Sequence, residues 1–149
     1  MAKNHSEKAA DLFLNGCNCA QAVFGAFAED CGLDTETALK LSSSFGGGMG
    51  RLREVCGAVT GMFMVAGILE GYTQKDDKKK KDDHYKLIQD LAEEFKAHHS
   101  TYICRELLGT IGKSSPVSEA RTPEYYKARP CVRFVITAAE ILDKHFFSE

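Results

Sequence analysis

The fold is decided by residues 54–72, which read EVCGAVTGMFMVAGILEGY. Between Glu54 and Glu70 no residue carries a charge, and apolar residues cover every side of a helix. A helix that is apolar all round is normally buried inside a protein. The uncharged run is shorter than the roughly 20 residues that a membrane-spanning helix needs. The stretch therefore predicts a buried central helix over about 54–72 and no membrane span.

Small residues recur on this helix at helical spacing. Gly57 and Gly61 are four residues apart and lie close to Cys56 and Thr60. A glycine inside a helix costs roughly 1 kcal/mol relative to alanine, so repeated glycines indicate a packing requirement. We therefore expect another helix to approach this face closely. The same face is compatible with a homodimer, because the neighbouring helix can belong to the same chain or to a second copy.

The rest of the chain also shows helical patterns, and no segment favours a strand. Asn18 and Asp34 are typical N-cap residues. The glycines at 46–50 end one helix, after which residues from Arg51 onward begin the central helix. Residues 110–123 are rich in glycine, serine and proline and predict a surface connection. Further helices are expected from Ser6 to Asn15, from Asn18 to Cys31, from Asp34 to Phe45, through Tyr85 to Phe95, from Ser100 or Thr101 through Cys104 to Leu108, and after Pro130.

These segments define the expected architecture. The chain has 149 residues and no internal repeat, which favours one domain with its own core. We predict a single domain over 1–149. Its fold class is all-α, a compact bundle of about five to seven helices around the central helix at about 54–72.

The charge distribution argues against two classes of partner. The formal net charge of −2 gives no field that would attract nucleic acid or an anionic membrane. The lysines at 78–81 lie among aspartates and are interpreted as a solvated helix start. The first residues are polar and charged and lack the apolar region of a secretory signal. We therefore predict a cytoplasmic protein that binds no nucleic acid.

Six cysteines are the chemically most informative residues of the chain. Static disulfides are rare in a reducing cytosol, so metal binding and redox chemistry gain weight as explanations. Free cysteines also serve as small buried hydrophobic residues. Cys17 and Cys31 lie near predicted helix ends and carry no further signal.

The other four cysteines fall near the first turn of a predicted helix. Unpaired backbone N–H groups and the helix dipole favour an anion at that position. The relevant anion is the thiolate, the form that attacks disulfides and binds metals. The four candidates are Cys19, Cys56, Cys104 and Cys131.

Several short motifs accompany these cysteines, and together they resemble a known family. They are Cys-Gly-Ala-x-x-Gly at 56–61, Asn-Cys-Ala at 18–20, Cys-Arg-Glu-Leu at 104–107, a late Cys131, and Phe-Gly-Gly-Gly-Met-Gly-Arg at 45–51. The set is similar to the C_GCAxxG_C_C proteins, which are described as redox-active. The family's box is written Gly-Cys-Ala, whereas this chain reads Cys-Gly-Ala. The resemblance covers nearly the whole chain and implies redox activity at Cys19, Cys56, Cys104 and Cys131.

Three functions remain open from the residues. The first is thiol–disulfide or electron-transfer chemistry with an unknown redox partner, in which Arg51 and Arg105 add positive potential. The second is a metal site in which the four thiolates hold zinc or an iron–sulfur cluster. The third is a non-catalytic helical interaction protein that needs no cofactor. The first two require the four sulfurs to gather at one end of the bundle, within about 10 Å of one another.

Two further groups have a structural and a functional interpretation. His98 and His99 precede Cys104 and are candidate ligands or bases, although one of a helical pair faces solvent. The glycines at 46–50, with Arg51 and Arg53, are similar to a phosphate cradle but lack the strand and lysine of a nucleotide-binding loop. A helix stop with a close backbone approach explains those glycines better.

Overall fold

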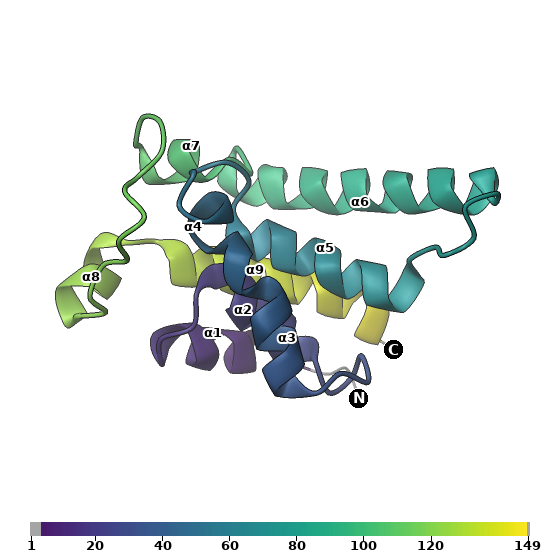
Figure 1. Cartoon of the computed structure of the whole chain (residues 1–149), viewed down its shortest axis with the longest axis horizontal. Helices are drawn as coiled ribbons and strands as arrows, with labels where there is room; N and C mark the ends of the chain where they lie inside the picture. The colour runs from purple at the N-terminus through teal and green to yellow at the C-terminus, as the bar shows by residue number, and fades with distance from the viewer. Residues whose placement is uncertain (1–3, 149) are drawn as a thin grey trace.

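Helix α5 (Gly57–Glu70) lies at the centre of the fold, with α6 (Lys78–His99) along one side and α2 (Cys19–Phe27) and α9 (Cys131–Leu142) packed on the others (Figure 1). This computed structural model describes residues 4–148. Within that part of the chain there are six helices of seven or more residues and no strands, as the all-α prediction requires. The other elements are α1 (Ser6–Leu14), α3 (Thr35–Ser42), η1 (Ser43–Phe45), α4 (Gly46–Met49), α7 (Cys104–Leu108), α8 (Pro123–Ala128) and η2 (Asp143–Phe147).

The central helix starts later than its apolar pattern predicts. It begins at Gly57 rather than near Glu54, because Arg53 has a left-handed φ of 63° and Val55 forms an antiparallel bridge with Ile103. From there to Ala66 most of α5 is buried, whereas Ile68 in its last turn is 47% exposed. The prediction of a buried central helix is therefore confirmed for most of its length.

The glycine face of α5 packs directly on α2. A Cβ atom on Gly61 would lie 2.9 Å from the Ala20 carbonyl oxygen and 3.0 Å from the Val23 Cβ. A Cβ atom on Gly57 would lie 3.2 Å from the Cys19 Cβ. Only glycine permits this approach, and it brings the N-termini of the two helices together.

Two glycine substitutions on α5 test this packing. Gly61→Ala is expected to lower the free energy of unfolding by about 1–3 kcal/mol, because its methyl group meets the backbone of α2. Gly67→Ala is the matched control on the same helix: apart from the adjacent backbone of α5, a Cβ atom on Gly67 would have no heavy atom within 4 Å. That control should gain up to about 1 kcal/mol from better helix propensity. Chemical denaturation measures both, and equal stabilisation by the two alanines would refute the close contact.

The predicted caps of α2 and α3 are confirmed. The Asn18 side chain accepts a hydrogen bond from the Gln21 N–H (2.9 Å), and the Gln21 side chain accepts one from the Asn18 N–H (3.0 Å). Asp34 accepts in the same way from the Thr37 N–H (3.0 Å). The reciprocal arrangement at Asn18 satisfies two of the donors that a helix start leaves unpaired. It fixes where α2 begins and so places Cys19.

Other helix boundaries differ from the sequence prediction. Helix α1 begins at Ser6, as predicted, but its N-cap residue is His5, which forms no side-chain cap hydrogen bond. Helix α7 begins after Ile103, whose N–H donates to the Thr101 hydroxyl (3.1 Å). The predicted connection over 110–123 ends with helix α8, which the sequence analysis missed. Thr122 caps α8, with Pro123 in its first turn.

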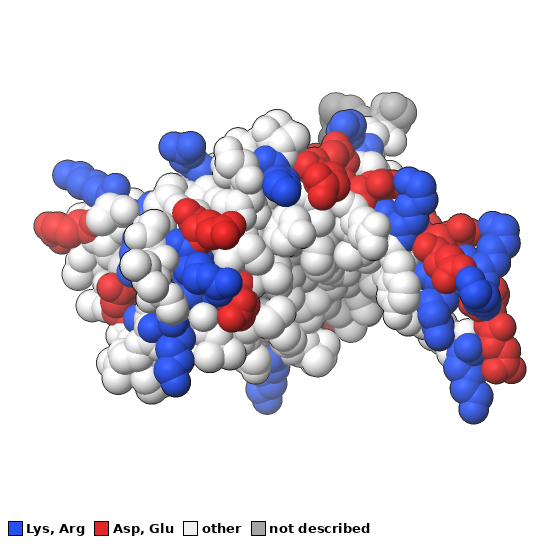
Figure 2. All heavy atoms as spheres, turned by 90° about the horizontal axis from the view of Figure 1, so that it is seen from above, with Lys and Arg blue, Asp and Glu red and all other residues white. Residues whose placement is uncertain are grey.

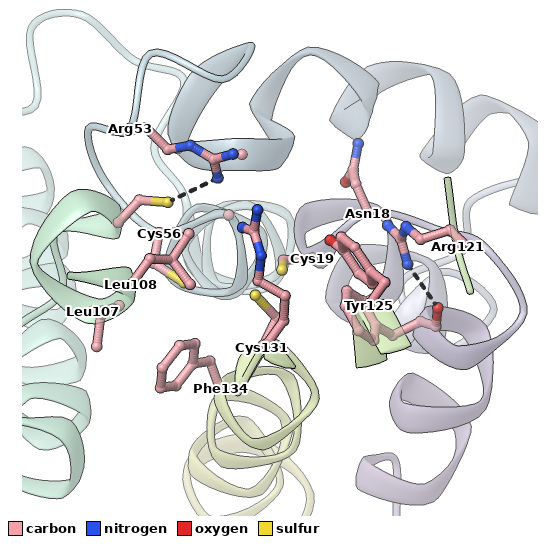
Figure 3. A pocket seen from close by; sticks show the side chains of 16 residues that line it. Asn18, Cys19, Arg53, Cys56, Leu107, Leu108, Arg121, Tyr125, Cys131 and Phe134 are labelled. Atoms are coloured by element: carbon pink, nitrogen blue, oxygen red, sulfur yellow. Dashed lines mark hydrogen bonds between the residues drawn. The ribbon is translucent and has the colours of Figure 1, made fainter. Parts of the chain in front are cut away.

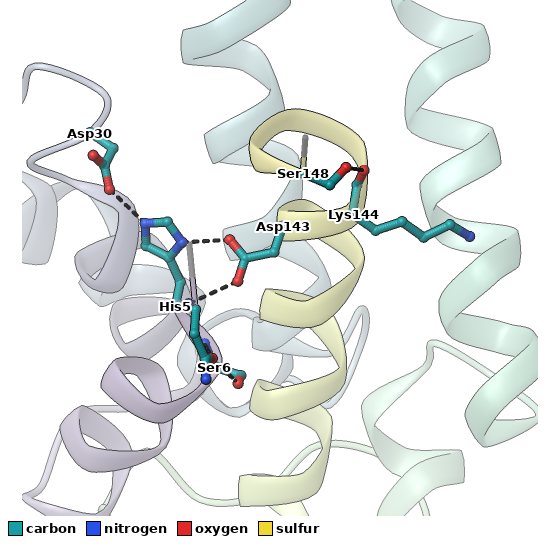
Figure 4. Close-up of polar contacts among 7 residues, drawn as sticks. His5, Ser6, Asp30, Asp143, Lys144 and Ser148 are labelled. Carbon is teal, nitrogen blue, oxygen red and sulfur yellow. Dashed lines mark hydrogen bonds and ion pairs between the residues drawn. The ribbon is translucent and has the colours of Figure 1, made fainter. Parts of the chain in front are cut away.

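His5 ties three distant segments together at the end of the bundle where the chain ends (Figure 4). Its Nδ1 and Nε2 atoms lie 2.5 Å from carboxylate oxygens of Asp143 and Asp30, respectively. The ring is 5% exposed and stacks on Phe27 with a centroid distance of 4.0 Å. These contacts hold the N-terminal segment against the loop after α2 and the end of α9.

The lysines at 78–81 lie at the exposed start of α6. Lys78 and Lys79 pair with Asp82 and Asp83, one helical turn later. Figure 2 shows positive and negative residues mixed at this end of the molecule. The prediction of a solvated helix start is therefore confirmed. No helix within residues 4–148 is long and apolar enough to cross a membrane.

Candidate functional site

The structure places four cysteines around one pocket, at the N-termini of four helices (Figure 3). Cys19, Cys104 and Cys131 are the first residues of α2, α7 and α9, and Cys56 immediately precedes α5. The cavity, which we call the inner pocket, has a volume of about 50 Å³. Cys17 and Cys31, which are also free thiols, do not line this pocket.

Cys56 and Cys104 are held together by the backbone. The bridge between Val55 and Ile103 is flanked by hydrogen bonds from the Cys56 N–H to Tyr102 (2.8 Å) and from the Cys104 N–H to Glu54 (2.5 Å). Two residues of extended backbone therefore align the starts of α5 and α7. Since diagonal neighbours across such a bridge share a face, both cysteines reach the same pocket.

The glycine-rich segment at 46–50 packs against this pair. Gly47 and Gly48 have left-handed φ angles of 66° and 69°, so α4 is a turn rather than a regular helix. A Cβ atom on Gly48 would lie 2.6 Å from the Cys104 Cβ and 2.8 Å from the Arg53 Cα. The interpretation of these glycines as a helix stop with a close backbone approach is thus confirmed.

Cys19 and Cys131 form the most polarised pair in the pocket, and their sulfurs point toward each other (Figure 3). Accepting a hydrogen bond from the Cys19 thiol lowers the pKa of Cys131, and the charges of Arg129, Arg53 and Arg121 lower it further against the effect of burial. The same hydrogen bond, together with burial and the nearby thiols, raises the pKa of Cys19 well above its usual value. Of the four pocket thiols, Cys131 alone has a pKa that is shifted downward.

Burial dominates at the other two cysteines. It raises the pKa of Cys56 to about 12, although the backbone N–H groups of Ala58 and Val59 oppose it. A rise from the usual pKa of about 9 corresponds to about 4 kcal/mol against the thiolate. A helix N-terminus typically stabilises an anion by only about 1 kcal/mol. Burial also raises the pKa of Cys104, opposed by a hydrogen bond from Arg53. A helix N-terminus alone therefore does not make these thiols acidic.

The positive potential at the sulfurs does not come from the arginines that the sequence singled out. Arg105 pairs with Glu54 (3.0 Å), and the Arg51 Nε donates to the Ser115 carbonyl (2.6 Å). Instead, Arg53 is buried beside the thiols, 4% exposed, and its Nη1 donates to the Cys104 sulfur (3.6 Å, dashed in Figure 3). The sequence pattern indicated Arg53 only as a partner of the glycine-rich segment.

Sequence reasoning missed further side chains that line the inner pocket, among them Arg129, Arg121, Tyr125 and Phe134. Arg129 lies two positions before Cys131, which is a signal that the sequence contained. Arg121 and Tyr125 reach the pocket from the segment around α8, and Phe134 comes from the next turn of α9. No local pattern marks the last three, because only the tertiary fold brings them to the cysteines.

The four thiols have the donor chemistry of a zinc or iron–sulfur site, but their arrangement does not fit one ion. In residues 4–148, no three His, Cys, Asp or Glu side chains are placed to hold a metal together. His98 and His99, at the end of α6, do not join the thiols in lining the pocket. His98 is exposed, and the His99 Nε2 lies 2.8 Å from the Thr137 hydroxyl.

Comparison with known proteins identifies the family. The model of the family described as "Putative redox-active protein (C_GCAxxG_C_C)" matches residues 17–145, a span that contains all four pocket cysteines. No curated protein and no solved structure matches the chain. Because the family match spans most of the sequence, the chain belongs to the C_GCAxxG_C_C family of redox-active, cysteine-containing proteins.

Proposed function

We propose that this protein performs thiol–disulfide exchange, with Cys131 as the attacking sulfur and Cys19 as the resolving sulfur. The observation that carries the proposal is the polarised pair itself. Cys131 has a lowered pKa, and a protonated Cys19 thiol donates a hydrogen bond to it. A thiolate beside a second thiol is the arrangement that exchange chemistry requires.

The exchange proceeds in two displacements. The Cys131 thiolate attacks one sulfur of a disulfide substrate, whose S–S bond breaks, and the first half leaves as a thiolate that takes a proton from water. Cys19, after losing its proton to solvent, attacks the Cys131 sulfur and releases the second half as a thiolate. Two electrons pass from the dithiol to the substrate, and a Cys19–Cys131 disulfide remains.

The first displacement prepares the second. While Cys131 is a thiolate, its hydrogen bond and negative charge hold the proton on Cys19. Once Cys131 is bonded to the substrate that charge is gone, so the pKa of Cys19 falls. Cys56 and Cys104 line the same pocket and stay protonated at neutral pH because burial raises their pKa values.

The pH dependence of alkylation tests this assignment. In the reduced protein, iodoacetamide should modify Cys131 before the other pocket cysteines, with a midpoint below the pH of about 9 that is usual for cysteine. Cys19→Ala removes the hydrogen bond and should move that midpoint upward by about one pH unit or more, since bonds to charged groups are worth about 1.5–3 kcal/mol.

Mass spectrometry of the alkylated peptides gives the midpoint for each cysteine. Cys17→Ala is the matched control, because Cys17 lies two residues from Cys19 but outside the pocket. In the Cys17→Ala variant, the pH midpoint for alkylation of Cys131 should equal that of the wild type. The assignment of Cys131 fails if the Cys19→Ala midpoint stays in place or moves to lower pH.

A further inference from the structure

A second, larger cavity adjoins the inner pocket. This outer pocket has a volume of about 280 Å³. The two share a wall, and in Figure 3 Asn18, Arg53, Arg121 and Tyr125 surround the approach to the sulfurs. A molecule in the outer pocket can therefore extend one end toward Cys131.

The walls of the two pockets carry an excess of positive charge. Arg51, Arg53 and Arg121 line the outer pocket, and Arg129 lines the inner one. Among the described residues 4–148, Glu119 is the only acidic residue that lines either pocket. Arg129 forms an ion pair with Glu119, and Arg51 lies 4.0 Å from the same carboxylate. The walls of the two pockets together therefore hold four guanidinium groups and one carboxylate, which pairs with two of them.

Two of these arginines have no carboxylate partner among residues 4–148. Arg53 is 4% exposed and uses two of its nitrogens, Nε to the Ser114 hydroxyl (2.8 Å) and Nη1 to the Cys104 sulfur. Arg121 is half-buried, donates to the carbonyls of Cys17 (3.0 Å) and Phe13 (3.2 Å), and lies over the rings of Phe13 and Tyr125. For the buried Arg53 the lack of an anion is unfavourable, because its desolvated charge is left uncompensated. An anionic ligand in the outer pocket would supply the missing partner.

The volumes limit what can bind. The inner pocket, at about 50 Å³, holds only a few atoms, whereas the outer pocket, at about 280 Å³, is close to the lower limit for small-molecule sites. A folded protein substrate or a large cofactor does not fit inside. A short chain does, with its sulfur in the inner pocket and its charged end in the outer one.

We propose that the outer pocket binds an anionic oxygen group, a carboxylate or a phosphate, of a small-molecule disulfide. Arg121, Arg53 and Arg51 hold the anion and direct the S–S bond toward Cys131. The substrate disulfide is the oxidant: it accepts two electrons and leaves as two thiols. The inference rests on the proposed exchange chemistry for the substrate class, but the anion site can be tested without that chemistry.

Binding of unreactive anions tests the site directly. Suberate has the length of 3,3′-dithiodipropionate but carries no sulfur, so its binding to the reduced protein by calorimetry reports the pocket alone. Inorganic phosphate is titrated in parallel to distinguish the two oxyanions. Arg121→Gln should weaken the binding of whichever anion is held by about tenfold or more, and Arg121→Lys should restore part of it. Lys127→Gln removes an exposed charge outside both pockets and is the control.

Reaction rates with matched disulfides then test the substrate class. The substrates are the anionic 3,3′-dithiodipropionate, the neutral bis(2-hydroxyethyl) disulfide and the cationic cystamine. For each one, the rate at which it oxidises the protein is divided by its rate of reaction with a free thiol. After this correction, the anionic compound should oxidise the protein at least tenfold faster than the neutral one, and cystamine should be slowest. This preference should shrink in Arg121→Gln and persist in Lys127→Gln.

The two experiments separate two kinds of failure. If neither suberate nor phosphate binds, or if Arg121→Gln binds as well as the wild type, the anion site is wrong even if disulfide exchange is observed. If an anion binds with the expected arginine dependence but no disulfide oxidises the protein, the exchange function and the substrate class are wrong while the anion site stands. Equal corrected rates for the three disulfides overturn the substrate class alone.

Discussion

A Cys131→Ser variant is expected to lose essentially all disulfide exchange, at least a hundredfold in rate. Serine keeps the size of the side chain, but its hydroxyl is not ionised at neutral pH and forms no bond of comparable stability to sulfur. Cys131 is the only pocket cysteine whose pKa is lowered, so no other sulfur provides an equivalent thiolate. Single-turnover reaction of the reduced protein with a small disulfide measures the loss.

Cys19→Ser should have a different outcome, which makes the assignment specific. The first displacement still occurs, but no resolving thiol follows, so the mixed disulfide on Cys131 accumulates and is detected by intact mass. Cys31→Ser is the control, since Cys31 lies outside the pocket and should leave both displacements unchanged. Rapid exchange in Cys131→Ser, or a mixed disulfide on Cys19 in place of Cys131, would contradict these roles.

The second large effect is a loss of stability at alkaline pH caused by Cys56. Its pKa is about 12 in the folded protein because of burial, against about 9 for an exposed thiol in the unfolded chain. Below pH 9 the thiol is neutral in both states and its contribution is fully present. As the pH rises above 9 the unfolded state loses the proton first, and stability falls by about 1.4 kcal/mol per pH unit until it levels off near pH 12.

Comparison of variants isolates this contribution from other alkaline titrations. Between pH 8 and pH 10.5, the free energy of unfolding of the wild type should fall by about 2 kcal/mol more than that of Cys56→Ala. In Cys31→Ala, which removes a half-exposed thiol, the fall in the free energy of unfolding over this pH range should be much closer to that of the wild type. Urea denaturation at each pH gives the values, and parallel pH curves for wild type and Cys56→Ala would show that burial does not hold the Cys56 proton.

Local sequence signals predicted most of the fold. The uncharged run between Glu54 and Glu70 identified the buried helix, and Asn18 and Asp34 marked two helix starts through their side-chain hydrogen bonds. Gly57 and Gly61 predicted a close helix contact, because glycine destabilises a helix and its repeated use indicates a packing requirement. These features depend on residues near one another in the chain, which is why a single sequence reveals them.

Boundaries set by distant contacts were less predictable. The late start of α5 depends on the pairing of Val55 with Ile103, residues far apart in the sequence. Helix α8 was missed because the preceding residues resemble a loop, although Thr122 followed by Pro123 is a typical helix start. In both places the residues adjacent in the chain did not lead to the helix boundary that the folded structure shows.

The cysteine positions could be predicted, but their chemistry could not. All four candidates lie at helix N-termini and line one pocket. The sequence suggested that such positions lower the pKa of a thiol, yet burial reverses this at Cys56 and Cys104. Arg121, which approaches from a distant segment, contributes to the potential at Cys131. Ionisation depends on burial and on neighbours in space, and neither is visible in the order of residues.

Disulfide mapping tests the central claim, that Cys19 and Cys131 are a reversible dithiol. The experiment uses protein with Cys17→Ser and Cys31→Ser, purified without oxygen and assayed for bound metal, then treated with a small disulfide and digested. We predict a metal-free protein that loses two thiols, yields a peptide linked through Cys19 and Cys131, and recovers both thiols on reduction. An unchanged thiol count, a link between other cysteines, or a bound metal that withholds all four thiols from reaction would contradict the account.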